Sequence, residues 1–87
     1  MFLKVDRIGI GLHASEIIAA VRTRVGVERF IVNKDAIDAS DRVDVGEPVG
    51  RRGEEFLIEL PAETTSGTWR VWVPKSALTG EALEAAE

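Results

Sequence analysis

Two glycines at the end of the first predicted strand give the chain its best match to a ligand-binding motif. Gly9, Gly11 and Ala14 fit the spacing G-x-G-x-x-A, in which backbone N–H groups at a helix start hold a pyrophosphate. Asp35, a carboxylate that could bind a ribose, follows the next predicted strand. A dinucleotide-binding fold needs further β-α-β units, however, and residues 41–87 have the pattern of hairpins. We therefore interpret the glycines as turn residues and predict no cofactor.

His13 is the only histidine in the chain, and imidazole is the side chain best suited to proton transfer near neutral pH. A general base must lie beside a nucleophile or a substrate proton. The sequence offers no coherent set of nucleophile, base and oxyanion donors. We therefore predict that His13 caps a helix or lies on the surface, that no residue is catalytic and that the protein is not an enzyme.

Four aspartates recur at every third position: Asp35, Asp38, Asp41 and Asp44. A metal site would require several of these carboxylates to converge on one point through a loop. The spacing lacks the pattern of a calcium-binding loop, so turns and caps are the better interpretation. We predict no metal site.

A basic and aromatic surface for single-stranded nucleic acid is a further hypothesis, because small β proteins bind single strands by stacking and phosphate contacts. The residues that could form it are Arg51, Arg52, Arg70, Lys75, Trp69 and Trp72. Four glutamates are interleaved with them: Glu47, Glu54, Glu55 and Glu59. The chain also has a net charge of −4, so nucleic acid is the alternative partner and not the leading one.

Composition limits the protein to one modest globular unit. The 87 residues are 45% hydrophobic and 30% charged and include no cysteine, which suits one small folded domain and excludes disulfides and thiol chemistry. We expect a domain over residues 1–78 and an acidic helix or tail over residues 79–87. Neither a signal peptide nor a membrane-spanning run is evident, so we expect a soluble, cytoplasmic protein without membrane contact.

Hydrophobic periodicity predicts one amphipathic helix over residues 14–25. Its apolar positions fall on one stripe of a helical wheel, and Gly26 could end it. Strands are predicted near residues 2–10, with a bulge at Asp6-Arg7, and over residues 27–32 and 42–45. The expected fold is α+β (β-α-β-β-β-β): the helix packs on a mostly antiparallel sheet of about five strands, with room to curl toward a half-barrel.

The strongest structural signal is a hairpin over residues 56–73. Apolar residues alternate on both sides of the loop from Pro61 to Thr68, which indicates two strands with one buried face. The predicted pairs on that face are Phe56 with Val73, Ile58 with Val71, and Leu60 with Trp69. The opposite face pairs Leu57 with Trp72 and Glu59 with Arg70, matches that stabilise a sheet by roughly 0.2–1 kcal/mol each.

The apolar pair on the second face of this hairpin suggests a function. One helix covers only one side of a sheet, so Leu57 and Trp72 would remain exposed, and such patches usually bind a partner. We expect a non-catalytic binding or adaptor protein that self-associates, most simply as a dimer, with a protein or small-molecule ligand at the seam. The predicted interface contains Leu57, Glu59, Arg70 and Trp72. In the nucleic-acid alternative, Arg51, Arg52 and Lys75 add contacts beside Arg70 and Trp72.

Overall fold

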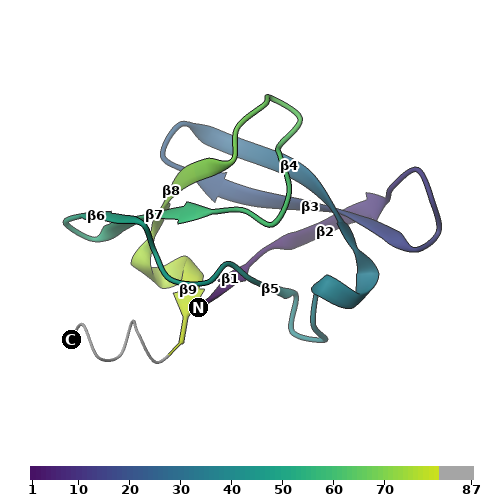
Figure 1. Ribbon diagram of the computed structural model, residues 1–87, viewed down its shortest axis with the longest axis horizontal. Coiled ribbons are helices and arrows are strands. Elements are labelled where there is room, and N and C mark those ends of the chain that lie inside the picture. The colour runs from purple at the N-terminus through teal and green to yellow at the C-terminus, as the bar shows by residue number, and fades with distance from the viewer. Residues whose placement is uncertain (81–87) are drawn as a thin grey trace.

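The computed structural model describes residues 1–80, and this part of the chain is almost entirely β-structure (Figure 1). Its strands are β1 (Phe2–Lys4), β2 (Asp6–Ile10), β3 (Glu16–Thr23), β4 (Gly26–Asn33), β5 (Arg42–Asp44), β6 (Gly50–Arg52), β7 (Glu55–Glu59), β8 (Arg70–Pro74) and β9 (Leu78–Thr79). Two single-turn 3₁₀ helices, η1 (Lys34–Ala36) and η2 (Lys75–Ala77), connect strands.

Three antiparallel sheets of three strands each enclose one core. Their strand orders are β5-β1-β9, β2-β3-β4 and β6-β7-β8. Each sheet contributes a fully buried side chain, such as Leu3 on β1, Phe30 on β4 and Ile58 on β7. The core cluster also includes Val5, Ala19, Val21, Val32, Ile37, Val43, Val45, Phe56, Leu60, Val71, Val73 and Leu78. The three sheets therefore stabilise one another through a common interior.

The predicted α+β fold is wrong, because the segment expected to be the amphipathic helix is the strand β3. All eight residues of β3 pair with β4, from Glu16 opposite Asn33 to Thr23 opposite Gly26. A two-residue turn joins the strands, and the Thr23 hydroxyl donates to the Gly26 carbonyl across it (2.8 Å). Gly26 has a φ of +130°, which only glycine adopts without strain.

The apolar run Ile17 to Val21 explains the error. Ala19 and Ala20 point to opposite faces of the strand, yet both are buried. A strand covered on both faces produces consecutive apolar residues, which periodicity alone cannot distinguish from a helix. The β-branched residues Ile17, Ile18 and Val21 favour the strand, and the matching partner strand β4 decides the outcome.

The predicted hairpin is confirmed at every predicted pair within β7 and β8. Phe56 lies opposite Val73, Leu57 opposite Trp72, Ile58 opposite Val71, and Glu59 opposite Arg70. Leu60 also donates its backbone N–H to the Trp69 carbonyl (2.8 Å). The expectation that Trp69 faces the core is wrong, however, because the side chain is 52% exposed and donates to Glu63.

Several shorter predictions are confirmed and others are refined. The predicted bulge interrupts β2 between Arg7 and Gly9. The turn η1 is followed by Ile37, which belongs to the core. Near residue 50, where no strand was predicted, β6 adds a third strand to the hairpin sheet. Thr79, which was predicted to begin the C-terminal helix or tail, belongs to β9 (Leu78–Thr79), and residues 81–87 of that predicted segment lie outside the described residues. Within the described part, no helix is long and apolar enough to span a membrane.

Candidate functional site

The G-x-G-x-x-A segment is the end of β2 and the turn into β3. Gly11 donates its N–H to the Glu16 carbonyl (3.0 Å), and His13 donates its backbone N–H to the Glu16 carboxylate (3.1 Å). A Cβ added to Gly11 would lie 2.8 Å from Glu16 Cβ, so the glycine allows close packing in this turn. Since a strand and not a helix follows, the segment presents no helix N-terminus for a pyrophosphate. The His13 side chain is exposed in the same turn.

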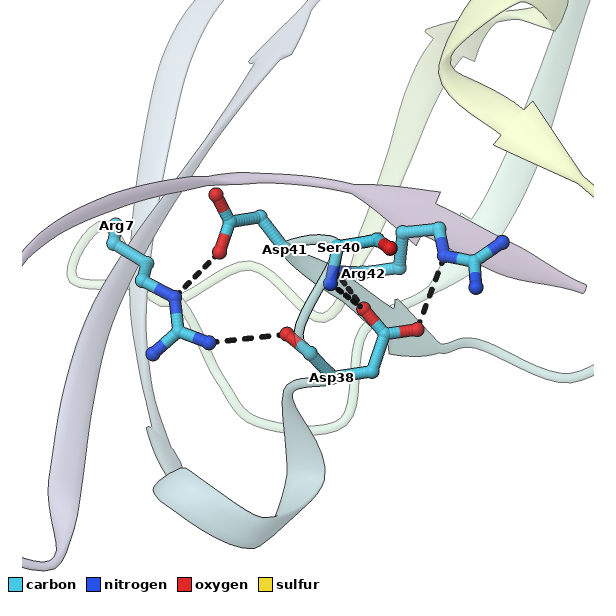
Figure 2. A network of polar contacts seen from close by, with 5 residues as sticks. All are labelled: Arg7, Asp38, Ser40, Asp41 and Arg42. Carbon is cyan, nitrogen blue, oxygen red and sulfur yellow. Dashed lines mark hydrogen bonds and ion pairs between the residues drawn. The ribbon is translucent and has the colours of Figure 1, made fainter.

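Two of the four regularly spaced aspartates organise the loop before β5 (Figure 2). Asp38 accepts backbone N–H groups of Ser40 (2.9 Å) and Arg42 (3.0 Å) and pairs with the Arg42 guanidinium (3.0 Å). Asp41 pairs with Arg7 of β2, which also donates to the Asp38 carbonyl (3.0 Å). Among the described residues no carboxylate or imidazole cluster could hold a metal ion. The aspartates therefore fix a turn and attach it to β2.

Replacing Asp38 by asparagine is expected to cause a loss of stability that depends on pH. Burial raises the pKa of Asp38, but the Arg42 and Ser40 N–H groups and the Arg42 charge outweigh it and hold that pKa below its usual value of 3.8. A lowered folded-state pKa stabilises the protein above pH 3.8, and the effect disappears as the pH falls through the folded-state value. Melting temperatures of wild type and Asp38→Asn should therefore differ near neutral pH and converge in acid. An equal difference at both pH values would contradict this role.

The predicted Leu57/Trp72 face exists, but it is narrower than expected. Gly50, Leu57 and Trp72 lie in one row across β6, β7 and β8. Leu57 and Trp72 are both half-buried. A Cβ on Gly50 would lie 3.7 Å from the indole Cη2, so the ring reaches across β7 toward β6. Only part of the apolar face is therefore available to a partner.

Two arginine side chains lie against the Trp72 ring. The guanidinium carbon of Arg24 lies 5.1 Å from the indole centroid, and that of Arg52 lies 5.4 Å from it, in the range of cation–π contacts. Arg24 comes from the β3–β4 turn, where its N–H donates to the Trp72 carbonyl (3.1 Å). Sequence reasoning missed Arg24 because this turn was assigned to the end of a helix. Only the correct hairpin places it beside β8.

The other predicted contact residues are not all brought together. Arg70 lies on the same face as Trp72, with Glu59 at 3.6 Å. Arg51 lies on the opposite face, where its guanidinium covers the Phe56 ring (5.5 Å). Lys75 lies in η2, and its N–H donates to the Glu54 carbonyl (2.8 Å). The structure thus groups Arg52, Arg70 and Trp72 and separates Arg51 from them.

A second surface, not recognised from the sequence, is the open edge of β2. All five residues of β2 are exposed, and β2 is an outer strand of its sheet. Ile8, Ile10 and Leu12 are exposed by 53%, 69% and 89%. Because strand amides alternate between edges and the Gly11 N–H points to β3, the backbone groups of Ile10 point to the open edge. This combination of apolar side chains and unpaired backbone groups is a template for pairing with another strand.

The opposite edge of the same sheet is closed by the loop between β7 and β8. Thr64 forms a β-bridge with Phe30, and the Thr65 N–H donates to the Arg29 carbonyl (2.8 Å). The sheet therefore has an open edge at β2, whereas the loop covers the edge of β4 at Arg29 and Phe30.

Comparisons with protein-family models, with curated proteins and with solved structures found no significant match to this chain.

Proposed function

We propose that the protein is a small, non-catalytic binding module that pairs with a second copy of itself through the open edge of β2. The observation that carries this proposal is the exposure of Ile8 and Ile10 on β2, and of Leu12 in the bend that follows, beside an outer edge of β2 that has no partner strand among the described residues. Pairing would satisfy these groups and remove apolar side chains from water, at roughly 1.5–3 kcal/mol for each side chain fully buried.

The alternating pattern of the strand favours a two-fold, antiparallel pair centred on Ile10. In that register Ile10 lies opposite its own copy, and the exposed side chains of Ile8, at the bulge, and Leu12, in the bend after β2, flank this central pair. The outward-facing backbone groups of Ile10 also pair with those of its copy. Two copies would thus form one continuous sheet, in the order β4-β3-β2-β2-β3-β4.

The covered edge at β4 argues that this assembly stops at two copies. Growth beyond a dimer would require a second open edge on each sheet, and the Thr64 and Thr65 contacts occupy it. The interface is therefore of the closed, two-fold kind rather than a filament.

Replacing Ile10 by lysine is expected to convert the dimer into a monomer, because two like charges would lie directly opposite each other at the centre of the interface. Sedimentation equilibrium of wild type and Ile10→Lys measures this change. Val25→Lys is the matched control, because Val25 is an exposed aliphatic residue at the β3–β4 turn. It should remain dimeric.

Two outcomes would overturn the proposal. Wild type that is monomeric at the highest soluble concentration would exclude self-association. A dimer that survives Ile10→Lys but dissociates in Trp72→Ala would move the interface to the Leu57/Trp72 face. Circular dichroism of each variant checks that the β-fold is retained.

A further inference from the structure

Beside Trp72 lies a hollow of about 170 Å³ lined by residues of the β3–β4 turn and of β8. Arg24, Glu28, Arg70 and Trp72 are among its lining residues. Ligand pockets for whole cofactors typically measure about 300–1,000 Å³. The hollow is smaller than that, so it suits a single planar ring better than a dinucleotide.

The charge on and beside this hollow is balanced, with three arginines and three glutamates, although the whole chain is acidic. The outer face of the β6-β7-β8 sheet carries Arg52 and Arg70, and Arg24 lies beside it. Glu55 and Glu59 lie on the same face. Glu55 pairs with Arg24, and Glu59 lies near Arg70. Arg52 has no ion-pair partner among residues 1–80. Glu28, on the far side, accepts the Ser66 hydroxyl (2.7 Å). One arginine next to an aromatic ring is thus available to an anion.

We propose that the surface formed by Arg24, Arg52, Arg70 and Trp72 binds single-stranded nucleic acid. A base stacks on the part of the Trp72 indole that remains exposed, and Arg52 contacts a neighbouring phosphate. Stacking on an aromatic side chain contributes without regard to base identity, and arginine contacts make the affinity depend on salt. Because the surface is independent of the β2 edge, this proposal goes beyond self-association.

The net negative charge of the chain limits the expected affinity for nucleic acid. Glutamates around the site and the net charge of −4 repel the phosphate backbone, so binding is expected to be weak and confined to low salt. Few phosphates contact the protein, so the salt slope is shallow: each phosphate contact adds a slope of about 0.7 for a single strand.

Quenching of Trp72 fluorescence by a thymidine oligonucleotide tests the proposal directly. The variant Trp69→Phe makes Trp72 the only tryptophan, so the signal reports this site alone. We expect saturable quenching at low salt that weakens at high salt. Arg52→Gln in the same background should weaken binding at least several-fold. Lys34→Gln is the charge-matched control and should leave binding unchanged. It removes one positive charge from η1, where the Lys34 N–H donates to the carbonyl of Ser15 in the turn after β2 (2.8 Å).

Inorganic polyphosphate is the second probe, because it supplies the phosphates without bases. The proposal predicts that it competes only weakly with the oligonucleotide and does not quench by stacking. Equal competition by polyphosphate would overturn the stacking contact. Absence of quenching at low salt, or equal weakening by Arg52→Gln and Lys34→Gln, would overturn the site. Ile10→Lys should bind as the parent does, which separates this result from that of self-association.

Discussion

Replacing Phe30 by alanine is expected to lower the free energy of unfolding by about 3–5 kcal/mol, the usual cost of deleting a buried aromatic ring. Phe30 is fully buried on β4, opposite Ala19 of β3. Because its small neighbour cannot fill the vacated space, the cavity should remain. Native proteins have only about 5–15 kcal/mol of stability in total, so this one change would remove a large share.

Urea denaturation measures the effect, and Trp69→Ala is the control for removal of a large aromatic ring. Trp69 is 52% exposed, so its loss should cost far less, about 1 kcal/mol or below for a surface side chain with one exposed hydrogen bond. Similar midpoints for the two variants would show that the core is not centred on Phe30.

Thr64→Val is the second substitution for which we expect a large effect, although it conserves volume. Thr64 is one of two buried polar residues among residues 1–80. Its hydroxyl accepts the Thr68 N–H (3.0 Å) and shares a hydrogen bond with Ser66 (3.0 Å). Valine cannot accept either bond. A fully buried N–H left without a partner costs about 1–3 kcal/mol, and the half-buried Thr68 N–H should cost about 1 kcal/mol, at the lower end of that range.

The neighbouring Thr65→Val is the matched control for this prediction. The Thr65 side chain is exposed, and only its backbone N–H contributes a described hydrogen bond, to Arg29. The control should change stability by less than about 0.5 kcal/mol, as surface substitutions usually do. Thermal unfolding followed by circular dichroism compares the two. Equal losses would mean that backbone pairing, and not the buried hydroxyl, holds this loop.

The sequence predicted the register of the β7–β8 hairpin because that pairing is decided locally. Alternating faces and opposite charges at Glu59 and Arg70 allow one register only. The β3 strand was missed because its identity depends on burial from both sides, which a local pattern does not contain. The pair of Ala19 and Ala20 has no strand signature of its own.

The candidate surfaces, too, could be predicted where local sequence decides them and not where tertiary structure does. The row of Leu57 and Trp72 was predicted, because both residues belong to the local hairpin. Arg24 could be placed on Trp72 only after the β3–β4 turn was known, since the two residues meet through tertiary structure. The open edge of β2 was likewise hidden, because an edge is defined by which strands are absent beside it.

The middle position of β1 in its sheet has a consequence for the order in which the chain folds. Leu3, fully buried, pairs on one side with Val43 and on the other with Leu78. The pairing of β1 with β9 joins residues near the two ends of the described chain. Closing so long a loop costs conformational entropy, which the chain loses before this contact can stabilise it. During synthesis, β1 therefore emerges long before its partner β9. Until Leu78 has left the ribosome, β1 has one open side.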